Sequence, residues 1–178
     1  MADKVMMHEE RILEEWAQLI QSGQGKAQDI YREIAKLIEE SRAPGISSQM
    51  VTVKVQASMK DLFSKRETER QYLRVLNENM KDFKFYIGAR DYGDNLDISW
   101  YLTCEPNLLK HVLSSALTKG ESGNALSFAL NLFEKQDLRS YVTVAHHSVL
   151  DAVSNVMKGL GQDPSTIDRK SKGFLGVS

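Results

Sequence analysis

The spacing of apolar residues changes twice along this 178-residue chain. Before Pro44, apolar side chains recur every three to four residues, which is the period of an amphipathic helix. In residues 50–105 they alternate with polar residues, as in strands that bury one face. After Pro106 the helical spacing returns. The sequence therefore predicts an α+β fold, with a central sheet between two helical regions.

Residues 4–43 are predicted to form an αα-hairpin. One stripe of apolar residues at helical spacing surrounds Trp16, and a second surrounds Ile34. Residues 22–25, which contain two glycines, interrupt the first stripe, and residues 43–45 end the second. Two amphipathic helices joined by a short glycine-rich turn are typical of a helical hairpin.

Residues 50–105 are predicted to form an antiparallel sheet of three or four strands. Clear alternation surrounds Val53, Phe85 and Trp100. The loop at residues 91–95 contains glycine and asparagine, which tolerate the positive φ of hairpin turns. A sheet whose strands each have one apolar face is expected to be covered on one side.

Residues 60–80 fit two interpretations. Residues 71–76 suit either the end of a long helix or a further strand. The turn signal at residues 77–79 and the alternation that restarts at Phe83 favour the strand. A short helix near residues 61–65 would then join the first two strands.

Residues 106–160 are predicted to form a layer of three helices packed on the sheet. Pro106 suits the first position of a helix, and the segment around Phe128 is apolar on nearly all sides. A last helix is expected from Leu138 to Met157. The prediction is thus one α+β domain at residues 1–160, followed by a tail at residues 161–178.

The balance of charges gives little support to a polyanionic partner. The chain has 23 lysines and arginines against 24 aspartates and glutamates. Nucleic acid is therefore disfavoured as a partner, although a local basic patch leaves it open. No apolar run reaches the roughly 18 residues of a membrane-spanning helix, so we expect no membrane insertion. The single cysteine, Cys104, and the absence of a signal-peptide pattern predict a cytoplasmic location.

Standard catalytic and cofactor motifs are absent from the sequence. It contains no phosphate-binding glycine loop, no dinucleotide fingerprint, no HExxH and no paired CxxC. The acidic loop at residues 91–97 does not match the ligand spacing of an EF-hand. We therefore predict no metal and no cofactor, and we favour a non-catalytic protein while leaving an enzyme open.

His147 and Asp151 form one candidate ligand site. They are four residues apart on the last predicted helix, so they share a face, as two metal ligands on one helix would. His111 or Glu134 could add a third ligand. The favoured interpretation is a surface ion pair, because no second spaced pair of ligands accompanies them.

Tyr86, Arg90 and Tyr101 form a second candidate ligand site. The alternation places them on the sheet face opposite the apolar residues. An open face with aromatic and basic groups would suit a ligand, including stacked single-stranded nucleic acid. The alternative is that a helical layer covers this face.

The end of the chain joins a basic cluster to an apolar tip. Such a segment could dock in a groove of a partner or add a strand to its sheet. It could equally be disordered or fold back over an edge of its own sheet. The candidate partner-binding residues are Arg169, Lys170, Lys172, Phe174, Leu175 and Val177.

Two functions follow from these features. The first is a non-catalytic protein-interaction module or accessory subunit of a larger intracellular assembly, or a homo-oligomer, which uses the helical hairpin or the tail. The second is a small-molecule-binding or hydrolytic enzyme with a site between the sheet and the C-terminal helices. The enzyme hypothesis predicts a pocket in which at least two of four side chains converge within hydrogen-bond reach. These are Cys104, His111, His146 and His147.

Overall fold

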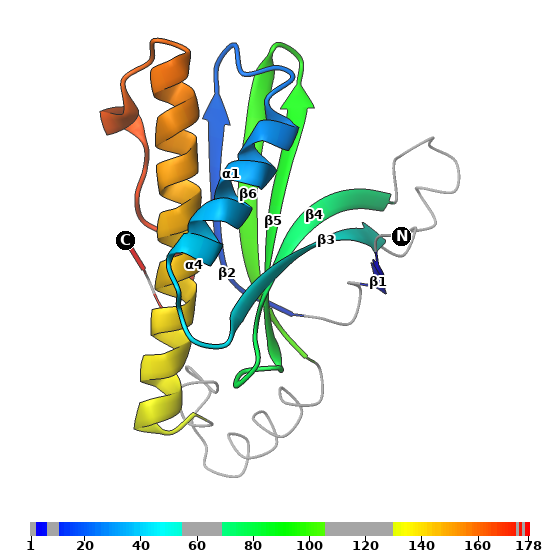
Figure 1. The fold of residues 1–178 in the computed structure, drawn as a ribbon, viewed down its shortest axis with the longest axis vertical. Helices are drawn as coiled ribbons and strands as arrows, with labels where there is room; N and C mark the ends of the chain where they lie inside the picture. The colour runs from blue at the N-terminus through cyan, green and yellow to red at the C-terminus, as the bar shows by residue number, and fades with distance from the viewer. Residues whose placement is uncertain (1–2, 7–10, 55–68, 106–129, 174, 176) are drawn as a thin grey trace.

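A computed structural model of the chain describes residues 3–6, 11–54, 69–105, 130–173, 175 and 177–178. Its centre is a seven-stranded sheet in the order β1-β3-β4-β5-β6-β2-β7. Two long helices, α1 and α4, lie side by side against one face of this sheet (Figure 1). The strands are β1 (Asp3–Met6), β2 (Arg11–Ile20), β3 (Ile46–Lys54), β4 (Glu69–Asn77), β5 (Phe83–Tyr92), β6 (Asn95–Cys104) and β7 (Lys172–Gly173). The helices are α1 (Ala27–Glu40), α4 (Leu132–Gly159) and a 3-10 turn, η1 (Pro164–Thr166).

The sheet is antiparallel except at one edge, where β1 runs parallel to β3. β5 and β6 form the predicted hairpin, with Gly93 at a φ of 62° in its turn. Residues 71–76 belong to β4, so the strand interpretation of that segment is confirmed.

The predicted αα-hairpin at residues 4–43 is wrong, because residues 11–20 form β2 rather than a helix. β2 pairs along its length with β6, which places Trp16 opposite Trp100. Trp16 is buried, whereas Ile12 and Leu19 are 49% and 47% exposed. The helix-like spacing arises because β2 carries apolar residues on both faces, and pairing with a central strand outweighs this local pattern. The second predicted helix is present as α1.

The predicted size of the sheet is also wrong. Residues 50–105 do contribute four strands as the higher estimate had it, with β3 starting slightly earlier, at Ile46. The other three strands, β1, β2 and β7, come from segments that the sequence assigned to a helical arm and a tail. These segments reach the sheet only through pairing with residues far away in the chain, which a local pattern does not record.

The predicted layer of three C-terminal helices is wrong for the described residues, where residues 106–160 contain α4 alone. The helices expected within residues 106–129 lie outside the described residues. α4 also begins earlier than its apolar stripe, since the Asn131 side chain accepts from the backbone N–H groups of Phe133 and Glu134. The Glu134 carboxylate accepts in turn from the Asn131 N–H, which completes a capping box.

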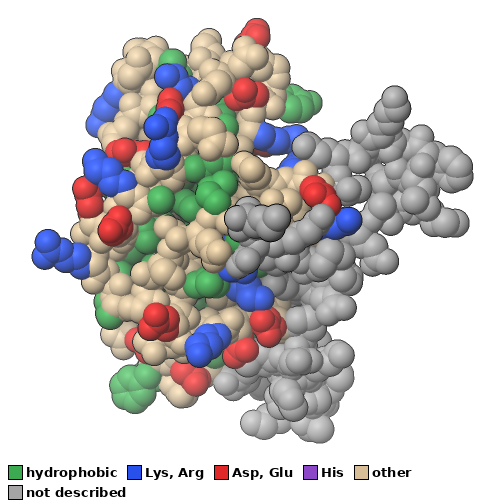
Figure 2. Space-filling view, turned by 45° about the vertical axis from the view of Figure 1, so that its right-hand side comes forward, with side chains coloured by type: hydrophobic (Ala, Val, Ile, Leu, Met, Phe, Trp, Pro, Cys, Tyr) green, Lys and Arg blue, Asp and Glu red, His purple; other side chains and the backbone are tan. Residues whose placement is uncertain are grey.

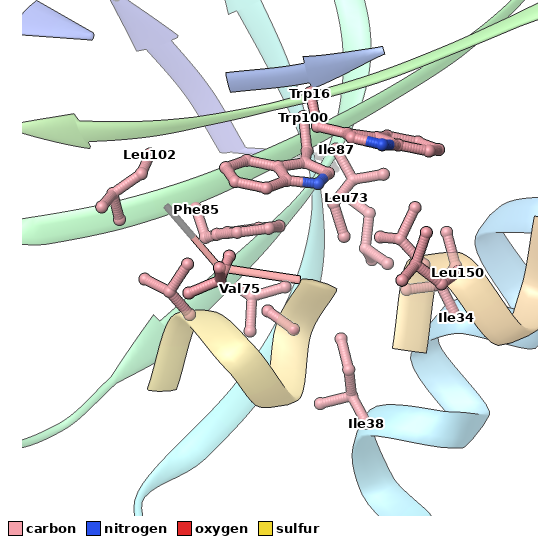
Figure 3. Close-up of a cluster of buried hydrophobic side chains, with 14 of the residues drawn as sticks. Trp16, Ile34, Ile38, Leu73, Val75, Phe85, Ile87, Trp100, Leu102 and Leu150 are labelled. Atoms are coloured by element: carbon pink, nitrogen blue, oxygen red, sulfur yellow. The ribbon is translucent and has the colours of Figure 1, made fainter. Parts of the chain in front are cut away.

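The main core lies between the sheet and the two helices. Side chains of the central strands point toward α1 and α4, as Figure 3 shows for Phe85 and Trp100. These two rings stack with their centroids 4.5 Å apart. A second, smaller cluster on the opposite face contains Val51, Val53 and Tyr86. The sheet therefore has one face under the helices and one face that α1 and α4 leave uncovered.

Neither of the described helices is long and apolar enough to cross a membrane. On the surface shown in Figure 2, acidic and basic side chains are interspersed, with small groups of hydrophobic side chains between them. This mixture agrees with the near-zero net charge of the chain.

Candidate functional site

A cavity of about 200 Å³ opens where β4 and β5 separate. These strands pair at residues 73–76 and 84–87, but both extend well beyond the pair Leu73–Ile87. We call this cavity the β4–β6 pocket. Most of its side chains lie on the sheet face that α1 and α4 leave uncovered. The lining residues are Arg70, Gln71, Tyr72, Gly88, Ala89, Arg90, Asp97, Ser99 and Tyr101.

Tyr31 of α1 occupies the gap between the two separating strands. Its hydroxyl lies 3.0 Å from the carbonyl oxygen of Gln71 and 3.1 Å from that of Ala89. The same hydroxyl accepts the N–H of Ala89 at 2.7 Å. Burial raises the pKa of Tyr31, so the hydroxyl keeps its proton near neutral pH. A side chain from the helix layer thus satisfies backbone groups that β4 and β5 do not pair with each other.

The ring of Tyr72 forms one wall of the β4–β6 pocket. It packs over Gly88, where a Cβ atom would lie only 2.8 Å from Tyr72 Cε1. The buried Tyr86 supports it edge-on, with ring centroids 6.4 Å apart. Burial raises the pKa of Tyr72, so its hydroxyl remains a hydrogen-bond donor. Within the described residues, the hydroxyls of Tyr72 and Tyr101 have no hydrogen-bond partner.

Arg90 is held on two sides at the rim of the β4–β6 pocket. Its Nε donates to Asp97 Oδ2 at 3.2 Å. Its guanidinium carbon lies 5.5 Å from the ring centroid of Tyr92, within the range of a cation–π contact. The ion pair is partly exposed, so it orients the side chain more than it stabilises the fold.

A second cavity, of about 280 Å³, adjoins the first. It shares Tyr101 with the β4–β6 pocket and extends across β2 to the C-terminal segment. We call it the tail pocket. Its lining residues are Glu15, Trp16, Ala17, Tyr101, Asp168, Lys170 and Lys172. Two of the predicted partner-binding residues, Lys170 and Lys172, are thereby brought next to Tyr101 of the predicted sheet site.

The C-terminal segment docks on its own domain. β7 pairs with Glu14 and Glu15 of β2, and the side chains of Leu175 and Val177 are buried. The Glu14 carboxylate, which is 1% exposed, accepts the N–H of Leu175 at 2.8 Å and that of Val177 at 3.3 Å. It also accepts the hydroxyl of Ser171. A buried carboxylate with three donors is well satisfied, and all three come from this segment.

Other predicted partner-binding residues are divided. Arg169 is exposed, while its carbonyl oxygen accepts from Nε2 of His146 at 2.8 Å. Phe174 lies outside the described residues. The burial of Leu175 and Val177 matches the fold-back interpretation of the tail, and whether they also contact a partner stays a prediction.

His147 and Asp151 are exposed on α4, so the structure does not bring them to the β4–β6 pocket. Nε2 of His147 lies 3.1 Å from the backbone oxygen of Ser178. Within the described part of the chain, no group of three metal-binding side chains comes together.

The residues of the enzyme hypothesis do not form a described pocket. His146 is fully buried between Trp16 and Trp100, and both of its ring nitrogens are engaged. Burial lowers the pKa of His146, which keeps the ring neutral. Cys104 is a buried free thiol. His111 lies outside the described residues, so the enzyme hypothesis stays untested.

Sequence analysis missed Arg70, Tyr72 and Gly88 as parts of a site. The alternation of β4 places Arg70 and Tyr72 on one face, and this signal was present in residues 70–76. The approach of Tyr72 to Gly88 had no sequence signal, because it depends on the pairing of β4 with β5. Neither a family model, nor a curated protein, nor a solved structure matches this chain.

Proposed function

We propose that the protein is a non-catalytic interaction module, an accessory subunit that binds a partner protein through the uncovered face of its sheet. The β4–β6 pocket and the tail pocket together form the binding surface. The observation that carries this proposal is the pair of unpartnered tyrosine hydroxyls, Tyr72 and Tyr101, at adjoining cavities. Tyrosine is enriched at protein interfaces because one side chain offers both apolar area and a polar group.

The tail and the helical hairpin serve this proposal less well as binding elements. No hairpin exists, and the buried positions of Leu175 and Val177 are occupied within the chain itself. The exposed lysines of the tail, Lys170 and Lys172, remain part of the surface because they line the tail pocket. A cytoplasmic assembly suits the free, buried thiol of Cys104, which requires no oxidising compartment.

Site-specific photo-crosslinking in the host cell tests this function. A benzophenone amino acid replaces Tyr101 in one variant and Asp151, which is exposed on α4, in a control variant. We expect a discrete protein adduct from position 101 only, and the same purified protein should bind the wild-type chain directly. Adding Ser99→Arg, which fills the β4–β6 pocket, should remove the adduct.

Adducts from position 151 alone would contradict the proposed surface. Equal adducts from both positions that Ser99→Arg does not reduce would also contradict it.

A further inference from the structure

The polar lining of the β4–β6 pocket is dominated by hydrogen-bond donors. Tyr72, Ser99 and Tyr101 contribute hydroxyls, and two guanidinium groups lie at its rim. Asp97 is the one carboxylate in the lining, and it already accepts from Arg90. A ligand that fits this lining must therefore bring acceptors.

The local charge favours an anion. Arg70 and Arg90 carry two positive charges against the single negative charge of Asp97. Arg90 is fixed between Asp97 and Tyr92 and uses Nε alone in its described hydrogen bond, which leaves four N–H donors. A cation held in one orientation loses little rotamer freedom when it binds an anion.

The size of the cavity limits what it can hold. At about 200 Å³ it is somewhat larger than the roughly 150 Å³ cavity that accommodates benzene. It is smaller than the ~300–1,000 Å³ typical of sites for drug-sized ligands. This volume suits an acidic side chain, whose carboxylate can accept from a guanidinium and a hydroxyl together.

The tail pocket continues this surface with further positive charge. Lys170 and Lys172 line it, and it meets the β4–β6 pocket at Tyr101. In an extended chain, alternate side chains point to the same side about 6.8 Å apart. Adjoining cavities with lysine at one end and arginine at the other therefore suit a segment with acidic residues at alternate positions.

From this geometry we infer that the β4–β6 pocket binds a carboxylate side chain from an acidic, extended segment of the partner protein. This inference rests on the proposed function and names the chemistry of the partner. The hydroxyls of Tyr72 and Tyr101 and the guanidinium of Arg90 hold the carboxylate. Lys170 and Lys172 attract the next acidic side chain.

Peptide titration of the full-length protein tests the inference. The probe is an eight-residue peptide of alternating glutamate and serine, and the control peptide has glutamine in place of glutamate. We expect the acidic peptide to bind at least tenfold more tightly than the control peptide. The backbone amide NMR signals of Gly88, Ser99 and Ala17 should shift, while that of Asn155 on α4 should not.

Three variants resolve the role of single groups. Tyr72→Phe removes one hydroxyl and keeps the ring, and Arg90→Gln removes the guanidinium. Each should weaken binding of the acidic peptide roughly tenfold, the effect of losing one hydrogen bond to a charged group. Asp151→Asn, on the exposed surface of α4, should leave binding unchanged. Chemical denaturation of each variant checks that the fold is retained.

The outcomes separate the inference from the proposed function. Equal binding of the two peptides, or acidic-peptide binding that Tyr72→Phe and Arg90→Gln do not change, would overturn the carboxylate site. Displacement of the peptide by inorganic phosphate but not by acetate would overturn it in favour of a phosphate site. If the acidic peptide fails while position 101 still crosslinks a partner, the inference falls and the proposed function stands.

Discussion

Nε1 of Trp100 donates to Nδ1 of His146 at 3.0 Å, which joins β6 to α4 in the buried interior. Because Nδ1 accepts, the neutral ring carries its proton on Nε2, which donates to the carbonyl oxygen of Arg169. One imidazole thus links the sheet, the long helix and the C-terminal segment. Figure 3 shows Trp100 beside Trp16, whose indole N–H donates to the carbonyl oxygen of Asp168.

This bond predicts a loss of stability in mild acid. The pKa of His146 is lowered in the folded state, so below about pH 6.5 the unfolded chain takes up a proton that the folded chain resists. The free energy of unfolding should therefore fall as the pH drops below about 6.5, by at most about 1.4 kcal/mol per pH unit from this group. The decrease ends once the pH passes the folded pKa.

Urea denaturation between pH 5 and pH 8 measures this effect. His146→Gln keeps an acceptor and a donor without a titrating group, so its curve should lose part of the slope. His147→Gln, at the exposed neighbouring position, should keep the slope of the wild-type protein. Identical slopes in the wild-type protein and His146→Gln would refute the assignment.

Glu14 is predicted to be the main anchor of the C-terminal segment. Glu14→Gln places an amide NH₂ among donor groups and should lower the free energy of unfolding by about 2–3 kcal/mol. Hydrogen exchange of the Leu175 and Val177 amides should become faster. Glu15→Gln is the matched control, because Glu15 is exposed, and it should change stability by less than about 0.5 kcal/mol. Unaltered exchange at Leu175 in the Glu14 variant would show that the carboxylate is dispensable.

Gly88→Ala is predicted to displace the ring of Tyr72. The new Cβ would lie 2.8 Å from Tyr72 Cε1, so the substitution should cost about 1–3 kcal/mol by overpacking. In a Tyr72→Ala background the same change should cost clearly less, since the ring is gone. A double-mutant cycle by chemical denaturation measures this coupling. Strict additivity of the two changes would rule out the contact.

Tyr31→Phe is predicted to loosen the junction of β4 and β5. The change leaves the N–H of Ala89 without its described acceptor and should cost about 1–3 kcal/mol. Amide exchange at Ala89 should accelerate together with a loss of thermal stability. Tyr92→Phe is the control, because Tyr92 is 63% exposed and its ring contact with Arg90 is retained. Protection of the Ala89 amide that survives Tyr31→Phe would contradict the role given to the hydroxyl.

Local patterns along the sequence determined a large part of the fold. The helical spacing of Ile30, Ile34 and Ile38 specified α1, because those side chains share one face of a helix and are buried in the structure. Alternation around Phe85 and Trp100, with a flexible turn at Gly93, specified the central hairpin. The same alternation placed Arg90 and Tyr101 on one face of the sheet.

Tertiary structure alone decided the remaining features. β2 is a strand because it pairs with β6, a partner about eighty residues further along, and its own apolar spacing favours a helix. The β4–β6 pocket exists because Tyr31 fills the gap where β4 leaves β5, and the tail folds back because Glu14 is buried beside it. Each of these contacts joins residues that are distant in the sequence. A local pattern reports which face of a segment is apolar, but it does not report which distant surface that face will meet.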